Sequence, residues 1–306
     1  MKHYTFVQKF VLIGLNGLDS IHASNAKTAV LRGVLAAKFL ERQFELLNKN
    51  IISEENKIQF QKGWEETLKI IRSLDSKRAK EIEQEITESL KTDQVLEEVP
   101  DILACDFNYE TAGIELKAYR TSAEVYQCII EEVRNEILKD DQISAECFGF
   151  IWLMRETGCI HEHFSVEEQK VIEKRMIELN KKNSVWKSLW EEEFHNVIEH
   201  FIVKFLKRKS EFFKNPYMEG VNLVFPFIER RKAIFIDFVV LGTNVASRRI
   251  AIMQYLSERG HYVEEVKNGS ETLLKIDNTY YRVFPSAKRI PRAHAIQGAY
   301  IVPVYQ

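Results

Sequence analysis

The chain has 306 residues, and its 43 Lys and Arg nearly balance its 45 Asp and Glu. No apolar run approaches the roughly 20 residues of a membrane-spanning helix, so the sequence predicts no integral membrane segment. The length exceeds the usual size of a single hydrophobic core, which predicts two domains.

The N-terminal stretch and the cysteines predict a cytoplasmic protein. Lys9 interrupts the apolar residues near the N-terminus and no small-residue cleavage site follows, which argues against a secretory signal. The four cysteines have no paired spacing and fall in or beside predicted helices, as reduced and packed thiols do.

Charge is distributed unevenly along the chain. Residues 216–306 hold 12 Lys and Arg against 8 Asp and Glu, which is a net charge of +4, and the first 215 residues carry −6. We therefore expect an anionic partner to meet either the C-terminal part or a local basic patch.

Apolar residues at helical spacing predict four N-terminal helices, over residues 5–15, 26–42, 54–74 and 75–90. The second helix is rich in small residues, so another backbone can approach it closely. Arg32 lies in its middle and either pairs with a buried carboxylate or is displayed to an anionic ligand. Residues 100–120 then break the helical period, and Gly113 allows a small hairpin between two short apolar pieces.

Three helices within residues 121–179 are expected to form the centre of the helical domain. The middle one begins after Ser144, is apolar nearly all round and ends at Gly158. Its two neighbours begin with predicted capping boxes, formed by Thr121 with Glu124 and by Ser165 with Glu168. A last amphipathic helix over residues 184–209 completes a helical domain that spans residues 1–212.

A linker over residues 213–220 separates the helical domain from a pattern of strands. One helix is predicted over residues 245–260, and strands over residues 233–242, 261–266, 271–276, 279–284 and 298–306. Asp277 and Asn278 form a hairpin turn of the kind that tolerates positive φ. The predicted fold class is therefore multidomain: a mainly helical domain followed by a small α/β module, residues 221–306, with a mixed sheet.

Motifs for nucleophilic or nucleotide chemistry are absent, since the sequence has no Gly-x-Ser-x-Gly and no glycine-rich phosphate loop. Cys159, His161 and His163 are dense enough to suggest zinc, but such residues rarely converge without a further ligand from elsewhere. Glu192 and His195 have the spacing of a di-iron motif that lacks its second copy. We expect no metal and no cofactor and favour a non-enzymatic protein, while a site assembled from scattered residues stays open.

In the C-terminal module, a helix ends at Gly260 and is followed by strands that carry Glu271 and Asp277. This order resembles the core of the PD-(D/E)xK nucleases, which hold a metal with Glu-x-Lys or Asp-x-Lys on the second hairpin strand. That strand reads YYRVF here, so the resemblance implies a degenerate, non-cleaving relative. The basic residues after the hairpin either contact nucleic-acid phosphates or form a solvated loop, and they are Lys288, Arg289 and Arg292.

Three pieces of the helical part cover about 200 residues: FVLIGLNGLDS with AVLRGVLAAKFLERQFEL, RTSAEVYQCIIEEVRNEIL, and FIWLMRETGCIHEHFSVEEQKVIEKRMIEL. In this order they resemble the Golgi phosphoprotein 3 family and its bacterial homologues, peripheral proteins that bind phosphatidylinositol 4-phosphate head groups. The resemblance implies that Arg32, within a matching Leu-Arg-Gly, contacts the phosphate. A second basic element of the family matches Lys77, Arg78 and Lys80, while the family's tryptophan falls at about Ala23.

The sequence thus favours a non-enzymatic, cytoplasmic binding protein that recognises an anionic, phosphoinositide-like head group at a membrane surface. Its expected ligand-binding residues are Arg32, Lys77 and Arg78, and its expected partners include other proteins and further copies of itself. The alternative is a nucleic-acid-associated protein that uses the degenerate nuclease-like module.

Overall fold

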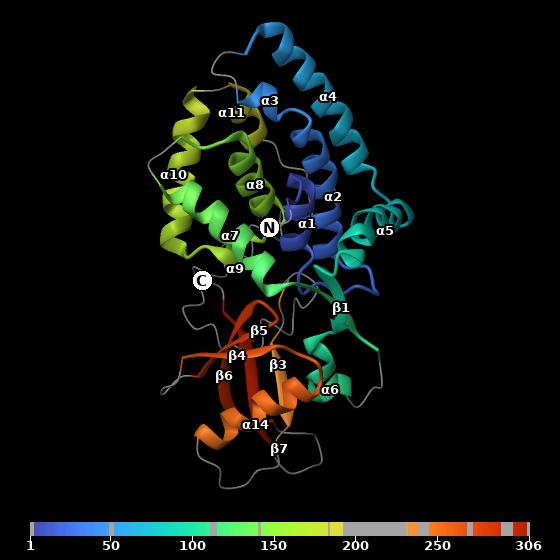
Figure 1. Ribbon diagram of the computed structural model, residues 1–306, viewed down its shortest axis with the longest axis vertical. Coiled ribbons are helices and arrows are strands. Elements are labelled where there is room, and N and C mark those ends of the chain that lie inside the picture. Colours follow the sequence, from blue (N-terminus) through green and yellow to red (C-terminus); the bar gives the residue numbers. More distant parts are fainter. Residues whose placement is uncertain are drawn as a thin grey trace.

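The computed structural model describes residues 3–48, 52–110, 115–139, 142–182, 184–191, 231, 233–237, 245–267, 272–288 and 296–304. Helices form the N-terminal part, and a small five-stranded sheet with one helix lies at one end of them (Figure 1). This arrangement confirms the predicted fold class of a helical domain followed by a small module of helix and strands. Among the described helices, none has both the length and the apolar character needed to cross a bilayer.

The N-terminal helices are α1 (Phe6–Gly14), α2 (Asn25–Glu41), α3 (Phe44–Leu47), α4 (Glu54–Arg72) and α5 (Ser76–Thr92). Four of them begin at a residue whose side chain accepts a hydrogen bond from the first turn, namely Thr5, Ser24, Ser53 and Asp75. These caps explain why the helices begin where the sequence pattern places them.

The strand pair β1 (Leu96–Pro100) and β2 (Lys117–Thr121) is antiparallel, with Leu96 opposite Thr121. The small hairpin expected around Gly113 is wrong, because the chain between the strands forms a 3-10 turn, η1 (Ile102–Cys105), and helix α6 (Phe107–Glu110). Asp101 caps the beginning of η1, since its carboxylate accepts a hydrogen bond from Leu103 N at 2.9 Å. Residues 111–114 lie outside the described residues.

Five helices complete the N-terminal part: α7 (Ala123–Leu138), α8 (Ala145–Glu156), α9 (Ile160–His163), α10 (Val166–Lys182) and α11 (Ser184–Glu191). Helix α8 is central as predicted, since Phe148, Phe150 and Trp152 are all buried. The expected helix beyond residue 191 and the expected linker over residues 213–220 lie outside the described residues.

The structure tests both predicted capping boxes. Ser165 and Glu168 exchange two hydrogen bonds, so their box is confirmed. The box of Thr121 with Glu124 is wrong, because Thr121 is the last residue of β2 and its hydroxyl donates to Leu12 O at 2.6 Å. Ser122 precedes α7 instead, without a side-chain capping bond.

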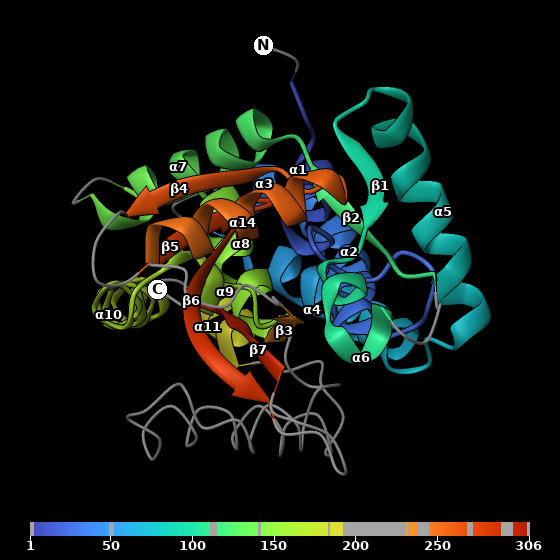
Figure 2. The same cartoon turned by 90° about the horizontal axis from the view of Figure 1, so that it is seen from below.

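The sheet has the order β3 (Ile234–Asp237), β7 (Ile296–Pro303), β6 (Thr279–Lys288), β5 (Thr272–Ile276) and β4 (Val263–Lys267). Every described pairing is antiparallel, so the expected mixed sheet is wrong for these strands. Helix α14 (Val245–Glu258) connects β3 to β4, which lie at opposite edges and so never pair. The helix lies against the sheet (Figure 2), and its Ile252 and Leu256 belong to the sheet's hydrophobic cluster.

A buried ion pair holds α2 against α5. Lys27 Nζ lies 2.9 Å from Glu83 Oε1, and the side chains of both residues are about nine-tenths buried or more. The Tyr119 hydroxyl donates to the same Glu83 oxygen at 2.8 Å. One carboxylate of α5 therefore fixes both a neighbouring helix and strand β2.

We predict that Glu83→Ala lowers the free energy of unfolding by about 3–5 kcal/mol, because it leaves the Lys27 ammonium buried without its counter-charge. Urea denaturation followed by circular dichroism measures this change. Glu85→Ala is the matched control on the same helix, since Glu85 is exposed and its pair with Lys38 is worth about 0–1 kcal/mol. Equal losses in the two variants would contradict the prediction.

Candidate functional site

The predicted ligand residues Lys77 and Arg78 lie in the first turn of α5, and both are exposed. The backbone N–H of Arg78 donates to the capping carboxylate of Asp75 at 2.7 Å. The Arg78 guanidinium also lies 3.0 Å from the exposed carboxylate of Glu81. Such a solvent-exposed pair is weak and readily exchanges for another anion.

These two residues belong to a larger cationic surface where α4 ends and α5 begins. We call it the basic corner, and it consists of five exposed residues, Lys69, Arg72, Lys77, Arg78 and Lys80. Asp75 is the single acidic residue between positions 69 and 80, so this segment carries a net charge of +4. Ile70, within the same corner, is 54% exposed.

Arg32 is half-buried in the middle of α2. It lies seven residues before Phe39, hence on the same face of the helix, and Phe39 packs on Phe60 and Trp64 of α4. Helices α2 and α4 run antiparallel (Figure 1), so the first half of α2 lies beside the second half of α4. The structure thus places Arg32 on a different helix from the basic corner, in the middle of α2 and on the face that packs against α4.

The two lysines of α2 form ion pairs with carboxylates of α5. Lys27 pairs with Glu83, and Lys38 Nζ lies 2.8 Å from Glu85 Oε1. The acidic middle of α5 therefore neutralises lysines of α2. The cations at its beginning are exposed, and Arg78 lies beside the exposed carboxylate of Glu81.

The expected nucleic-acid residues of the C-terminal module are only partly described. Lys288 ends β6, where it pairs with Ile296 of β7. Arg289 and Arg292 lie outside the described residues, so their position relative to Lys288 is not tested.

The dense group Cys159, His161 and His163 does not converge on a common point. Cys159 is buried beside the Thr157 hydroxyl, whereas His163 is buried beside the Tyr126 hydroxyl and His161 is exposed. Within the described ranges, no group of three or more His, Cys, Asp or Glu side chains is arranged to hold a metal ion. Glu192 and His195 lie outside those ranges.

A second candidate site lies where the predicted β5–β6 turn meets the helical part, a contact that the sequence did not indicate. Asp277 and Asn278 adopt the predicted positive φ, at 46° and 72°. The Asn278 amide donates to Thr121 O at 2.8 Å and to Asn16 Oδ1 at 3.2 Å. The turn is therefore docked by buried hydrogen bonds between the sheet and the helices.

Asp277 is the centre of this contact. Its carboxylate accepts hydrogen bonds from Arg120 Nη1 at 3.0 Å, from Tyr262 N at 3.0 Å and from His261 Nδ1 at 2.6 Å. Burial by itself raises the pKa of Asp277, but the bonds and charges of His261, Tyr262 N–H and Arg120 outweigh it, so the pKa lies below its ordinary value. On the far side of the imidazole, His261 Nε2 lies 3.7 Å from Cys105 Sγ.

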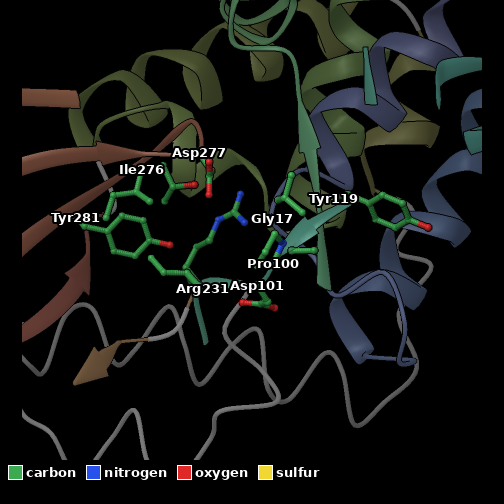
Figure 3. Close-up of a pocket in the computed structure, with 12 residues that line it drawn as sticks. Gly17, Pro100, Asp101, Tyr119, Arg231, Ile276, Asp277 and Tyr281 are labelled. Carbon is green, nitrogen blue, oxygen red and sulfur yellow. The ribbon is translucent and has the colours of Figure 1, made fainter. Parts of the chain in front are cut away.

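A cavity of about 30 Å³ adjoins this contact, enough for about one water molecule (Figure 3). The guanidinium of Arg231 lies in it and forms a buried ion pair with Glu162, at 3.0 Å. Gly17 is required here because its φ is 70° and an added Cβ would lie 1.6 Å from Arg231 Nη1. The cavity is too small for an organic ligand, so it is a small gap in the packing between the sheet and the helices.

Comparison with known proteins adds no assignment to either site. No protein-family model, no curated protein and no solved structure matches the chain.

We predict that Asn278→Gly lowers the free energy of unfolding by about 1–3 kcal/mol, because Thr121 O loses its buried donor. Glycine tolerates the positive φ, so the change isolates the side-chain hydrogen bonds from backbone strain. Gln94→Gly is the matched control, since Gln94 has a φ of 57° but is exposed, and it should be nearly neutral. The prediction is wrong if thermal and urea denaturation give the two variants the same loss in free energy of unfolding.

The lowered pKa of Asp277 predicts a pH-dependent stability. A depressed carboxyl pKa stabilises the fold above the unfolded-state pKa of about 3.9, and this contribution is lost as pH falls through the folded-state pKa. Asp277→Asn removes it, so the wild type should exceed the variant in free energy of unfolding at pH 7, and the gap should narrow toward pH 3. Urea titrations at several pH values measure the gap, and a constant difference would refute the assignment.

Proposed function

We propose that this chain is a non-enzymatic binding protein that recognises an anionic, phosphate-bearing lipid head group at a membrane surface. The observation that carries the proposal is the basic corner, where five exposed cations face two carboxylates, the cap Asp75 and the Arg78 partner Glu81, on a part of the chain that is otherwise acidic. Arg32 contributes from the middle of the neighbouring helix α2.

Magnitudes support a weak, reversible association. Each Lys or Arg near an anionic membrane contributes about 1 kcal/mol, so the corner supplies about 4–5 kcal/mol, or roughly a thousandfold in affinity. The acidic remainder of the helical part opposes this, but its distant charges are screened beyond about 8 Å at physiological salt. Binding by this surface should therefore be local in origin and strongly dependent on salt.

The composition of the corner favours phosphate over a diffuse negative surface. Arg72 and Arg78 carry planar guanidinium groups that can bind phosphate oxygens in pairs, whereas Lys77 acts as a point charge. The beginning of α5 adds the partial positive charge of a helix N-terminus. Ile70 offers an exposed apolar side chain that could enter the membrane interface.

The resemblance of the helical part to the Golgi phosphoprotein 3 family supports the same ligand class. The matching Leu-Arg-Gly supplies Arg32, and the family's later basic element falls on Lys77, Arg78 and Lys80, three residues that occupy the N-terminal end of α5. The missing tryptophan near Ala23 is the departure that weakens a strict head-group specificity.

Vesicle co-sedimentation tests the proposal. Vesicles of phosphatidylcholine alone are compared with vesicles that also contain phosphatidylserine or phosphatidylinositol 4-phosphate, at low and at physiological salt. We predict binding to the anionic vesicles only, with tighter binding to phosphatidylinositol 4-phosphate and loss at higher salt. Lys77→Ala with Arg78→Ala should weaken binding about 30-fold, since two contributions of about 1 kcal/mol disappear.

The matched control removes two exposed lysines from a distant helix. Lys170→Ala with Lys174→Ala changes the net charge equally on α10, which lies on the opposite side of the helical part from α5 (Figure 2). If the wild type fails to sediment with any anionic vesicle at low salt, membrane recognition is abandoned. If both double variants lose binding equally, the protein's overall charge is responsible and the basic corner is not the site.

A further inference from the structure

Three side chains distant in the sequence lie in line where the sheet meets the helices. Cys105 ends the 3-10 turn after β1, His261 follows α14, and Asp277 is in the β5–β6 turn. The imidazole bridges the other two, with Nε2 at 3.7 Å from the sulfur and Nδ1 at 2.6 Å from the carboxylate. A nucleophile, a base and a carboxylate that orients the base have this order in hydrolases and transferases with a triad.

The charges around the imidazole favour transfer of a proton from the sulfur. Asp277 holds a carboxylate against Nδ1, which stabilises the imidazolium that would form when Nε2 takes the thiol proton. Arg120 and the Tyr262 N–H share the same carboxylate and keep it ionised. A thiolate is the reactive form of cysteine, so the arrangement supplies what an oxidation needs.

Size decides which electrophile can reach the sulfur. Cys105 is 1% exposed and packs in the apolar cluster of the sheet module. The neighbouring cavity holds about 30 Å³, and although Cys105 does not line it, Ile102, Ile276 and Tyr281 belong both to its wall and to that cluster. An acyl group does not fit such a space, whereas hydrogen peroxide, with two heavy atoms, is close to water in size.

We propose that Cys105 is a peroxide-reactive thiol, a modification site in which His261 and Asp277 promote oxidation of the sulfur by hydrogen peroxide. His261 Nε2 accepts the thiol proton, and the sulfur attacks one peroxide oxygen. A sulfur–oxygen bond forms, the oxygen–oxygen bond breaks, and the departing hydroxide takes the proton from the imidazolium to give water. The sulfur is oxidised to a sulfenic acid and the peroxide is reduced to water.

The other thiols of the chain provide internal controls. Cys147 is equally buried, and its pKa is raised, mainly by burial and then by the nearby Glu136 carboxylate. Cys128 is exposed on α7. Burial alone makes a thiol inert, so the comparison of Cys105 with Cys147 separates the effect of His261 from the effect of burial.

The experiment treats the full chain with hydrogen peroxide at neutral pH and removes the peroxide with catalase at set times. The chain is then unfolded in the presence of iodoacetamide, which alkylates only thiols that are still reduced. Mass spectrometry measures the alkylated fraction of each cysteine. We expect Cys105 to be oxidised at least about tenfold faster than Cys147, and faster than Cys128. An oxidation rate of Cys105 no greater than that of Cys147 would overturn the proposal, and this comparison needs no variant to fold.

His261→Gln tests the mechanism in the same assay. Glutamine can keep a hydrogen bond to Asp277 but cannot accept the thiol proton, so oxidation of Cys105 should fall to the rate of Cys147. The rate of Cys147 in this variant reports whether the helical core is still closed. Unchanged oxidation of Cys105 with Cys147 still protected would refute the role of His261, and if Cys147 becomes reactive, the wild-type comparison decides alone.

Discussion

The position of the sheet depends on burying one turn. Asp277 and Asn278 have positive φ, and Asn278 is 8% exposed, so this polar turn is stable only where hydrogen-bond partners surround it. Asn16, Arg120 and Thr121 supply those partners from the regions just after α1 and at the end of β2. Because β5 and β6 meet at this turn, the same bonds hold the whole sheet against one end of the helices (Figure 1).

The features that the sequence predicted correctly are local. The turn at Asp277 and Asn278 follows from the tolerance of these residue types for positive φ, and the caps at Ser144 and Ser165 follow from bonds that span three residues. The central position of α8 follows from its apolar residues on every side. Each of these features is determined by residues within one turn or one helix, so it can be predicted from the neighbouring sequence.

The features that were missed depend on partners far along the chain. Thr121 looks like a helix cap in the sequence, but its hydroxyl donates a hydrogen bond to the carbonyl of Leu12 near the end of α1. That carbonyl needs a donor because a helix leaves its last carbonyls without partners. The line of Cys105, His261 and Asp277 joins residues up to 172 positions apart from three separate segments, and no spacing rule detects that. The antiparallel sheet likewise follows from which edges α14 connects rather than from any one strand.

Helix α5 separates two uses of charge along its length. In its middle, Glu83 is buried against Lys27, and this carboxylate stabilises the packing of α2. In its first turn, Lys77 and Arg78 are exposed at the positive end of the helix dipole, where each cation costs about 0.3–1 kcal/mol instead of stabilising the helix. The helix dipole therefore opposes cations at this end, and the exposed pair of Arg78 with Glu81 offsets little of that cost. The basic corner is thus the part of the helical surface on which the proposed binding of an anion rests.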